Sequence, residues 1–278
     1  MSDRRRLLGP SNTIIPSVGV SSNYDLIEVE KTDNRSIDQI RKFFLKTSSI
    51  ENANGSAYLE VGNTIIQASI FGPRPIHGSF VNRASLSVEC KFLPYINQPG
   101  DSLFNSQDLF NNNSNGFGKT ELTNIEQKIS SYIETCLLPS IILEKYPKST
   151  LDIFISIISI DETSKSNASL LNLINWIVNC SSLALVDAGI ELKDIVTSGQ
   201  VRLSNNEIIM DPILPGVGVD ALISFMNLRN DEIVGIWLEG DDELNDESLD
   251  KIIKGCNEMS KKIRANINSY LLKNAQNV

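Results

Sequence analysis

The sequence contains one histidine and four widely separated cysteines, and this scarcity removes several classes of functional site. No Cys-x-x-Cys pair is present, and His77 has no cysteine at the short spacing that zinc sites use. No serine or cysteine near His77 belongs to a recognisable nucleophile motif. We therefore expect no metal site and no cofactor, and we expect buried thiols in a reducing compartment at all four cysteines: Cys90, Cys136, Cys180 and Cys256.

An excess of positive charge is also missing. The 278 residues include 25 Lys and Arg against 34 Asp and Glu, which gives a formal net charge of −9. A protein with this balance does not hold nucleic acid through its overall field, so any RNA contact must be local or shared with partners. The 41% apolar content predicts a substantial core.

Targeting signals are absent as well. The opening MSDRRRLLGP has no apolar segment behind its arginines, and we expect that no apolar run reaches the length that a membrane span needs. We expect an intracellular protein with no membrane contact.

Two nucleotide-binding motifs are imitated but incomplete. The segment GFGKT at 116–120 lacks the glycine that should stand six residues before its lysine, because position 113 is asparagine. The segment PGVGVD at 215–220 lacks the third glycine of a dinucleotide fingerprint and precedes a predicted strand, so a turn is the better interpretation. The acidic residues 239–247 are interpreted as a solvated loop.

The apolar periodicity predicts an α+β fold. Strands are expected on both sides of Gly62-Asn63, in a tight hairpin, and at 83–92, with one wet face. A strand at 149–160 reads as apolar on both faces. Helices are expected at 122–137, ended or bent by Pro139, at 167–188, capped by Gly189, and at 246–272, while further strands fall within 194–212 and 221–240.

The chain divides into an N-terminal arm at 1–35 and one domain at 36–278, in which 96–120 is predicted to be a mobile loop. Two basic groups are candidate binding residues. The first group, around Arg74 and Arg83, lies beside a strand end and could contact an RNA backbone or be solvated surface. The second group, Arg4-Arg5-Arg6, could also contact RNA, but the apolar pair Leu7-Leu8 that follows it better suits docking to a partner. These candidates are Arg74, Arg83 and Lys119 for RNA, with His77 nearby, and Arg4, Arg5, Arg6, Leu7 and Leu8 for a partner.

Four strings together resemble the RNase PH family of phosphate-dependent exoribonucleases: NANGSAYLEVGNT, IFGPRPIHGSF, EKYPKSTLDIF and LALVDAGIELKD. The resemblance spans nearly the whole chain in consistent order. It implies an RNase PH-like βαβα fold with mixed and antiparallel sheets packed against helices. It also implies a place in the six-membered core ring of the RNA exosome, built of three heterodimers and topped by RNA-binding cap proteins, in the nucleus and nucleolus and also the cytoplasm.

The resemblance also implies that the catalytic groups of active members are lost. The Gly-Ser/Thr-Arg triplet that holds phosphate in active members falls on Asn172-Leu173-Ile174, and a shift to Ser164-Lys165-Ser166 would restore one cation. Asp211 matches the first of two aspartates, but the second position falls on Val217, with Asp220 as the nearest substitute.

An arginine pair that grips RNA in active members is replaced by Asn124 and Ile125. The leading hypothesis is therefore a non-catalytic ring subunit that lines the RNA channel. Two alternatives remain open: an active phosphorolytic 3'-to-5' exoribonuclease using Lys165, Asp211 and Asp220, and a free-standing RNA-binding protein.

Overall fold

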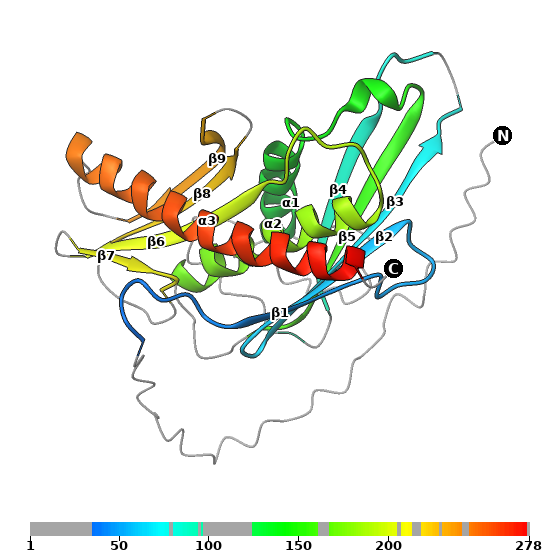
Figure 1. Ribbon diagram of the computed structural model, residues 1–278. Helices are drawn as coiled ribbons and strands as arrows, with labels where there is room; N and C mark the ends of the chain where they lie inside the picture. The colour runs from blue at the N-terminus through cyan, green and yellow to red at the C-terminus, as the bar shows by residue number, and fades with distance from the viewer. Residues whose placement is uncertain are drawn as a thin grey trace, which may run out of the picture.

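The described part of the chain folds into two β-sheets and three α-helices in four layers, as shown by the computed structural model in Figure 1. The order of elements is strands, helix, strand, helix, strands, helix, which confirms the predicted α+β class. The structure describes residues 35–77, 80–93, 96, 124–160, 167–204, 207–212, 218–227, 230–240 and 245–276. Most of the expected arm and all but residue 96 of the expected 96–120 loop lie outside these ranges.

The first sheet has five strands in the order β1-β2-β3-β5-β4, in which β4 runs parallel to β5 and all other neighbours are antiparallel. The predicted hairpin is present, because Val61 pairs with Thr64 and Gly62 takes a φ of +59°. The strands are β1 (Phe43–Thr47), β2 (Gly55–Val61), β3 (Thr64–Pro75), β4 (Ser85–Phe92) and β5 (Ser149–Ser159).

Three strands of this sheet show where the sequence pattern was sufficient and where it was not. In β4, buried and exposed side chains alternate, as predicted. Strand β5 lies in the interior of the sheet between β3 and β4, as its apolar composition predicts, but burial on both faces is wrong: the face with Ile153 and Ile155 is buried, whereas the face with Asp152 and Phe154 is half-exposed. The helices lie on one side of this sheet only, among the described residues. Strand β1 was not predicted, because its FFLKT stretch is too short to show a period.

Helix α2 (Asn167–Asp187) lies between the two sheets and contacts β2 and β3 on one side and β6 and β8 on the other (Figure 1). It ends in a Schellman motif: Ile190 N–H donates to Leu185 O, Gly189 N–H donates to Val186 O, and Gly189 has φ +67°. The second sheet is antiparallel in the order β7-β6-β8-β9, formed by β6 (Thr197–Ser204), β7 (Glu207–Met210), β8 (Val219–Met226) and β9 (Glu232–Glu239).

Helix α1 (Asn124–Leu137) shares the middle layer with α2 and packs on β4 and β9. It ends two residues before Pro139, as predicted, and a short 3-10 helix, η3 (Leu143–Lys145), follows. Helix α3 (Asp246–Gln276) covers the outer face of the second sheet. Its predicted inward side chains Ile252 and Cys256 are fully buried, but Leu249, also expected inward, is 36% exposed.

Helix α2 also corrects one expectation about length. Its window Leu170–Asp187 has a mean hydropathy of 1.3 and is long and apolar enough to cross a membrane, so the expectation that no apolar run has this length is wrong. However, 83% of that window is buried inside the fold, as the central helix of a layered core requires.

Two glycines test how tightly these layers pack. A Cβ atom added to Gly199 would lie 2.2 Å from the backbone oxygen of Cys256, where α3 crosses β6. We expect Gly199→Ala to lower the free energy of unfolding by about 3 kcal/mol, because the backbones must separate. Gly189→Ala meets no atom within 4 Å and should cost only about 1 kcal/mol for the positive φ. Urea unfolding of both variants checks the order, and equal losses would contradict it.

Candidate functional site

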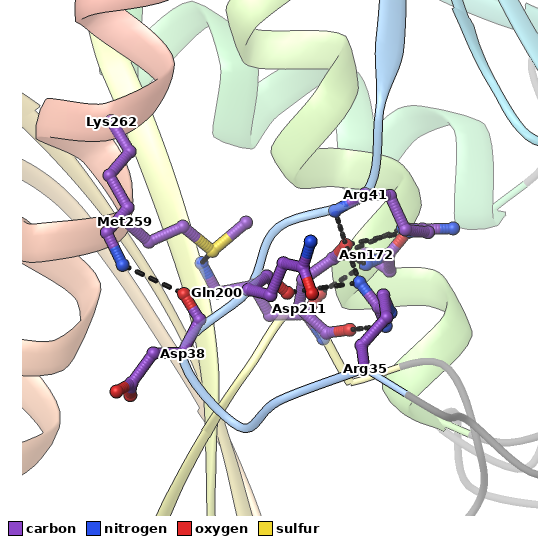
Figure 2. Close-up of polar contacts among 9 residues, drawn as sticks. Arg35, Asp38, Arg41, Asn172, Gln200, Asp211, Met259 and Lys262 are labelled. Atoms are coloured by element: carbon purple, nitrogen blue, oxygen red, sulfur yellow. Dashed lines mark hydrogen bonds and ion pairs between the residues drawn. The ribbon is translucent and has the colours of Figure 1, made fainter.

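Asp211, the residue that matches an active-site aspartate in the resemblance, is fully buried directly after β7 (Figure 2). Arg35 Nη1 donates to its Oδ2 at 3.0 Å, and Arg41 donates through Nε to Oδ2 and through Nη2 to Oδ1, both at 2.8 Å. Asn172 Nδ2 donates to Oδ1 at 2.7 Å. Both carboxylate oxygens are therefore saturated by charged or amide donors.

The segment before β1 and helix α2 hold this carboxylate, and β6 supports it through Asn172. Arg41 lies two residues before β1, Asn172 lies in the second turn of α2, and Gln200 lies in β6 and accepts from Asn172 Nδ2 at 2.8 Å. The segment that carries the arginines is itself fixed, since Met210 N–H donates to Ile37 O at 3.0 Å. Lys262 of α3 donates to Asp38 O at 2.8 Å, and Figure 2 shows the Asp38 carboxylate directed away from Asp211.

The three positions that match the phosphate-binding triplet do not form an anion site. Leu173 is 3% exposed and Ile174 is fully buried in the hydrophobic core. The Asn172 side chain is occupied, because its amide nitrogen donates to Gln200 and Asp211 and its oxygen accepts from Arg41. An oxyanion would need free N–H donors, and these side chains offer none there.

Asp220, the nearest substitute for the missing second aspartate, is also engaged. It lies opposite Arg202 in the β6–β8 register and accepts from Arg202 Nε at 2.7 Å and from Nη2 at 2.9 Å. Its other neighbour is Glu239 of β9. Burial raises the pKa of the Glu239 carboxyl, the hydrogen bond from Trp237 opposes this rise, and the nearby Asp220 charge adds to it.

The remaining expected catalytic positions also differ from those of an active member. Asn124 begins α1 and is exposed, whereas Ile125 is buried, so neither supplies a cation. Lys165 lies outside the described residues. Within the described ranges, no group of three or more His, Cys, Asp or Glu side chains has a metal-binding arrangement.

The cysteines are poor nucleophiles in this fold. All four are buried, as predicted, and burial raises the pKa of Cys136 to about 11 and that of Cys180 and Cys256 to about 12. Burial also raises the pKa of Cys90, further increased by the Glu126 charge. Since the thiolate is the reactive form, these side chains serve packing.

A second cluster lies at the end of the first sheet where β3 finishes and β4 and β5 begin. Thr150 of β5 pairs with Arg74 on one side and with Ser85 on the other, so the loops around it meet. Lys148 ties them together: Ile76 N–H donates to Lys148 O, and Lys148 N–H donates to Val81 O. We call the resulting exposed group the cationic rim; it consists of Arg74, His77, Phe80, Arg83 and Lys148.

The rim combines positive charge with an exposed aromatic ring. Phe80 is 70% exposed. The Arg74 guanidinium lies 4.9 Å from the centroid of the Phe71 ring and 3.7 Å from the Asp152 carboxylate, which offsets part of its charge. Bases stack on such rings, and cations hold phosphates.

Sequence patterns placed Arg74 and Arg83 together but missed Phe80 and Lys148. Lys148 lies more than sixty residues from Arg83 in the chain, and only the β5 register brings it to the rim, so no local signal reveals it. Phe80 and Val81 form an isolated apolar pair between polar residues, and such a pair in a polar loop is the one sequence signal that could have identified Phe80. The other predicted binding residues, Lys119 and Arg4, Arg5, Arg6, Leu7 and Leu8, lie outside the described ranges.

Comparisons with known proteins agree with this fold. Residues 39–191 match the family described as "3' exoribonuclease family, domain 1". The chain is 29% identical over 274 residues to "Exosome complex component MTR3" of Chaetomium thermophilum, covering 90% of both chains. It is 30% identical over 220 residues to "Exosome complex component mtr3" of Schizosaccharomyces pombe, covering 76% of this chain and 72% of the relative.

Solved structures resemble the chain at lower sequence identity, and this likeness concerns the fold. Rice (Oryza sativa) Rrp46 superposes with a TM-score of 0.66 at 20% identity, over 86% of this chain and 99% of that chain. A chain of the Archaeoglobus fulgidus exosome, solved with RNA bound to the active site, superposes with a TM-score of 0.60 at 15% identity, over 84% and 91%. The layered arrangement is therefore an RNase PH-like fold.

The buried ion cluster predicts a structural role for Asp211. Asp211→Asn leaves two partly buried guanidinium groups without their shared counter-ion and should lower the free energy of unfolding by about 3 kcal/mol. Asp250→Asn is the control, because its pair with Lys254 is exposed and should contribute under about 0.5 kcal/mol. Urea unfolding measures both. A loss at Asp211 no larger than the control would refute the structural role.

Proposed function

Because the chain belongs to the 3' exoribonuclease (RNase PH) family, we propose that it is a non-catalytic structural subunit of the exosome core ring. In this role it supports 3'-to-5' RNA processing and degradation by lining the RNA channel and by contacting ring and cap partners. The proposed partners are other RNase PH-like subunits, one of them in a heterodimer, RNA-binding cap proteins, and the RNA itself. The proposed locations are the nucleus, the nucleolus and the cytoplasm.

The observation that supports inactivity most directly is the state of Asp211. Phosphorolysis needs a bound phosphate nucleophile and a carboxylate that can serve a metal or a proton at the scissile bond. Asp211 is fully buried and accepts from Arg35, Arg41 and Asn172, so it has no free face for substrate. Leu173 and Ile174 occupy the core where the matched triplet of an active member would bind phosphate.

The alternative is an active phosphorolytic 3'-to-5' exoribonuclease that uses Lys165, Asp211 and Asp220. It requires two carboxylates facing one substrate. Each of these aspartates is instead paired with arginine: Asp211 with the partly buried Arg35 and Arg41, and Asp220 with the buried Arg202. Freeing either carboxylate would remove a counter-charge from these arginines, which is costly. The structure therefore favours the inactive form.

The division into an arm at 1–35 and a domain at 36–278 belongs to the same proposal, with Arg4–Arg6 and Leu7-Leu8 docking into a partner. Arg35, at the junction, is fixed to Asp211, so the arm would leave the domain beside the second sheet. Lys119, Arg74 and Arg83 are proposed RNA contacts. For a chain of net charge −9, such contacts gain strength when several subunits present theirs around one channel.

Purification of the native complex through this chain tests the proposal. We expect a native mass that contains several RNase PH-like chains and far exceeds the 30.8 kDa of this chain. Incubating the complex with labelled RNA and inorganic phosphate should give nucleoside diphosphates at the same rate whether this chain is wild type or carries Lys165→Ala or Asp220→Asn. The variants must first be shown by mass to occupy the complex.

Two results would contradict the proposal in different ways. Recovery of the chain as a lone monomer would remove the ring assignment. Diphosphate release that stops with Lys165→Ala or Asp220→Asn in an intact complex would establish the phosphorolytic alternative. The free-standing RNA-binding alternative predicts that the isolated chain binds single-stranded RNA with a salt-sensitive affinity.

The cationic rim gives a separate prediction for RNA binding by the assembled complex. Phe80→Ala should weaken single-stranded RNA binding by about fivefold or more, because one base loses its stacking surface. Arg83→Ala should reduce the slope of log affinity against log salt by about one unit. Fluorescence anisotropy at several salt concentrations measures both effects.

Phe44→Ala is the matched control for the rim. Phe44 is 56% exposed, but it lies on β1 opposite Glu60, toward the far end of the first sheet. Glu60 pairs with Ile65 of β3, and Ile65 precedes Arg74 of the rim by nine residues along that strand, which is roughly 30 Å. Equal losses from Phe44→Ala and Phe80→Ala would show that the rim is not the RNA contact.

A further inference from the structure

The position of Arg74 in the cationic rim depends on an irregularity in β3. Phe71 pairs with Asp152 of β5 and Arg74 pairs with Thr150, so three steps along β3 match two along β5. In a regular strand, residues three apart point to opposite faces. The extra residue returns Arg74 to the face that carries Phe71, as a β-bulge does when it redirects a side chain. The arginine is therefore held on the face of the sheet that no described helix covers.

Two side chains of that face contact the Arg74 guanidinium, and they differ in charge. The guanidinium carbon lies 4.9 Å from the centroid of the Phe71 ring, and Nη1 lies 3.7 Å from Asp152 Oδ2. The Phe71 ring orients the guanidinium and leaves its charge intact. Asp152 places a negative charge beside it, in an ion pair that is too long for a hydrogen bond.

The exposure of this ion pair decides what it contributes. The Arg74 side chain is 55% exposed and that of Asp152 is 23% exposed, so solvent reaches both partners. A pair this exposed adds little to stability. Its charge still acts on an approaching anion, because the two groups lie well within the screening length of about 10 Å at 0.1 M salt. A phosphate that approaches Arg74 therefore meets a carboxylate already paired with it.

We propose that Asp152 competes with the phosphate groups of single-stranded RNA for Arg74 and thereby weakens the hold of the cationic rim on RNA. This inference rests on the proposed function, in which Arg74 contacts RNA, and it adds a residue that limits this contact. The guanidinium does not need the carboxylate for its orientation, because the bulge and the Phe71 ring already provide it. Removing the charge of Asp152 should consequently increase the affinity for RNA.

A weak contact at each site suits a strand that has to move. RNA that is threaded past several subunits must release every contact before it advances, so each site has to be weak enough to leave, as in ion-conducting pores. The total binding strength then comes from the number of sites. The ion pair between Arg74 and Asp152 sets such a limit within this chain.

Asp152→Asn in the assembled complex tests the competition. The amide keeps the shape of the side chain and removes its charge, so the thermal unfolding midpoint should stay nearly unchanged. Fluorescence anisotropy at about 50 mM salt should show single-stranded RNA bound about two- to fivefold more tightly. The slope of log affinity against log salt should become steeper by up to about 0.7 unit, the value for one phosphate contact on a single strand.

Glu60→Gln is the matched control, because it removes one negative charge from the same face of the sheet. Glu60 pairs with Ile65, which precedes Arg74 by nine residues on β3, or roughly 30 Å. Salt screens its charge at this distance, so RNA affinity should equal that of wild type. Phe71→Leu should have the opposite effect to Asp152→Asn and weaken binding about twofold or more, since the ring that orients Arg74 is lost.

Combining Asp152→Asn with Arg74→Ala identifies the route of the effect. Arg74→Ala alone should weaken RNA binding, and Asp152→Asn should give no gain in that background. A gain that persists without Arg74, or no gain while Arg74 is present, would refute the competition. If Arg74→Ala alone leaves the affinity unchanged, both the competition and the RNA contact at Arg74 fail. The ring assignment is judged separately by the native mass, which none of these substitutions should alter.

Discussion

The buried carboxylate of Asp211, neutralised by Arg35 and Arg41, is the interaction on which the joining of the two sheets depends. A lone buried carboxylate is unfavourable by several kcal/mol, so the fold persists only where both guanidinium groups and the Asn172 amide reach it. Arg35 and Arg41 lie 176 and 170 residues from Asp211 in the sequence, and Asn172 lies 39 residues from it. The cluster thus fixes the segment before β1 against the end of β7 and the start of α2.

The same contacts support the proposal that this chain, although it belongs to a family of enzymes, has a structural role. Chemistry at a phosphate requires charge that faces solvent and substrate, whereas Asp211 and Asp220 each face an arginine in the interior. Leu173 and Ile174 add packing on α2, the helix that both sheets share. Asp211 and Asp220, which would have to be free for catalysis, instead form ion pairs within the fold.

The proposed function therefore depends on surface residues of the domain rather than on its buried charges. An acidic chain carries a local cationic rim because the β3–β5–β4 register gathers side chains from three loops at one sheet end. Local charge of this kind is compatible with the proposed shared channel, in which the contacts of several subunits add together.

The sequence by itself determined the element types, the Gly62 hairpin, the alternation of β4 and the Gly189 end of α2, because these depend on neighbours within a few residues. It also predicted, through the family resemblance, that the phosphate-binding triplet is replaced. Only the tertiary structure decided that Asp211 is bound by Arg35 and Arg41 and that Lys148 and Phe80 join the rim. Those features arise from pairings between distant segments, and one-dimensional periodicity carries no information about which buried charge meets which.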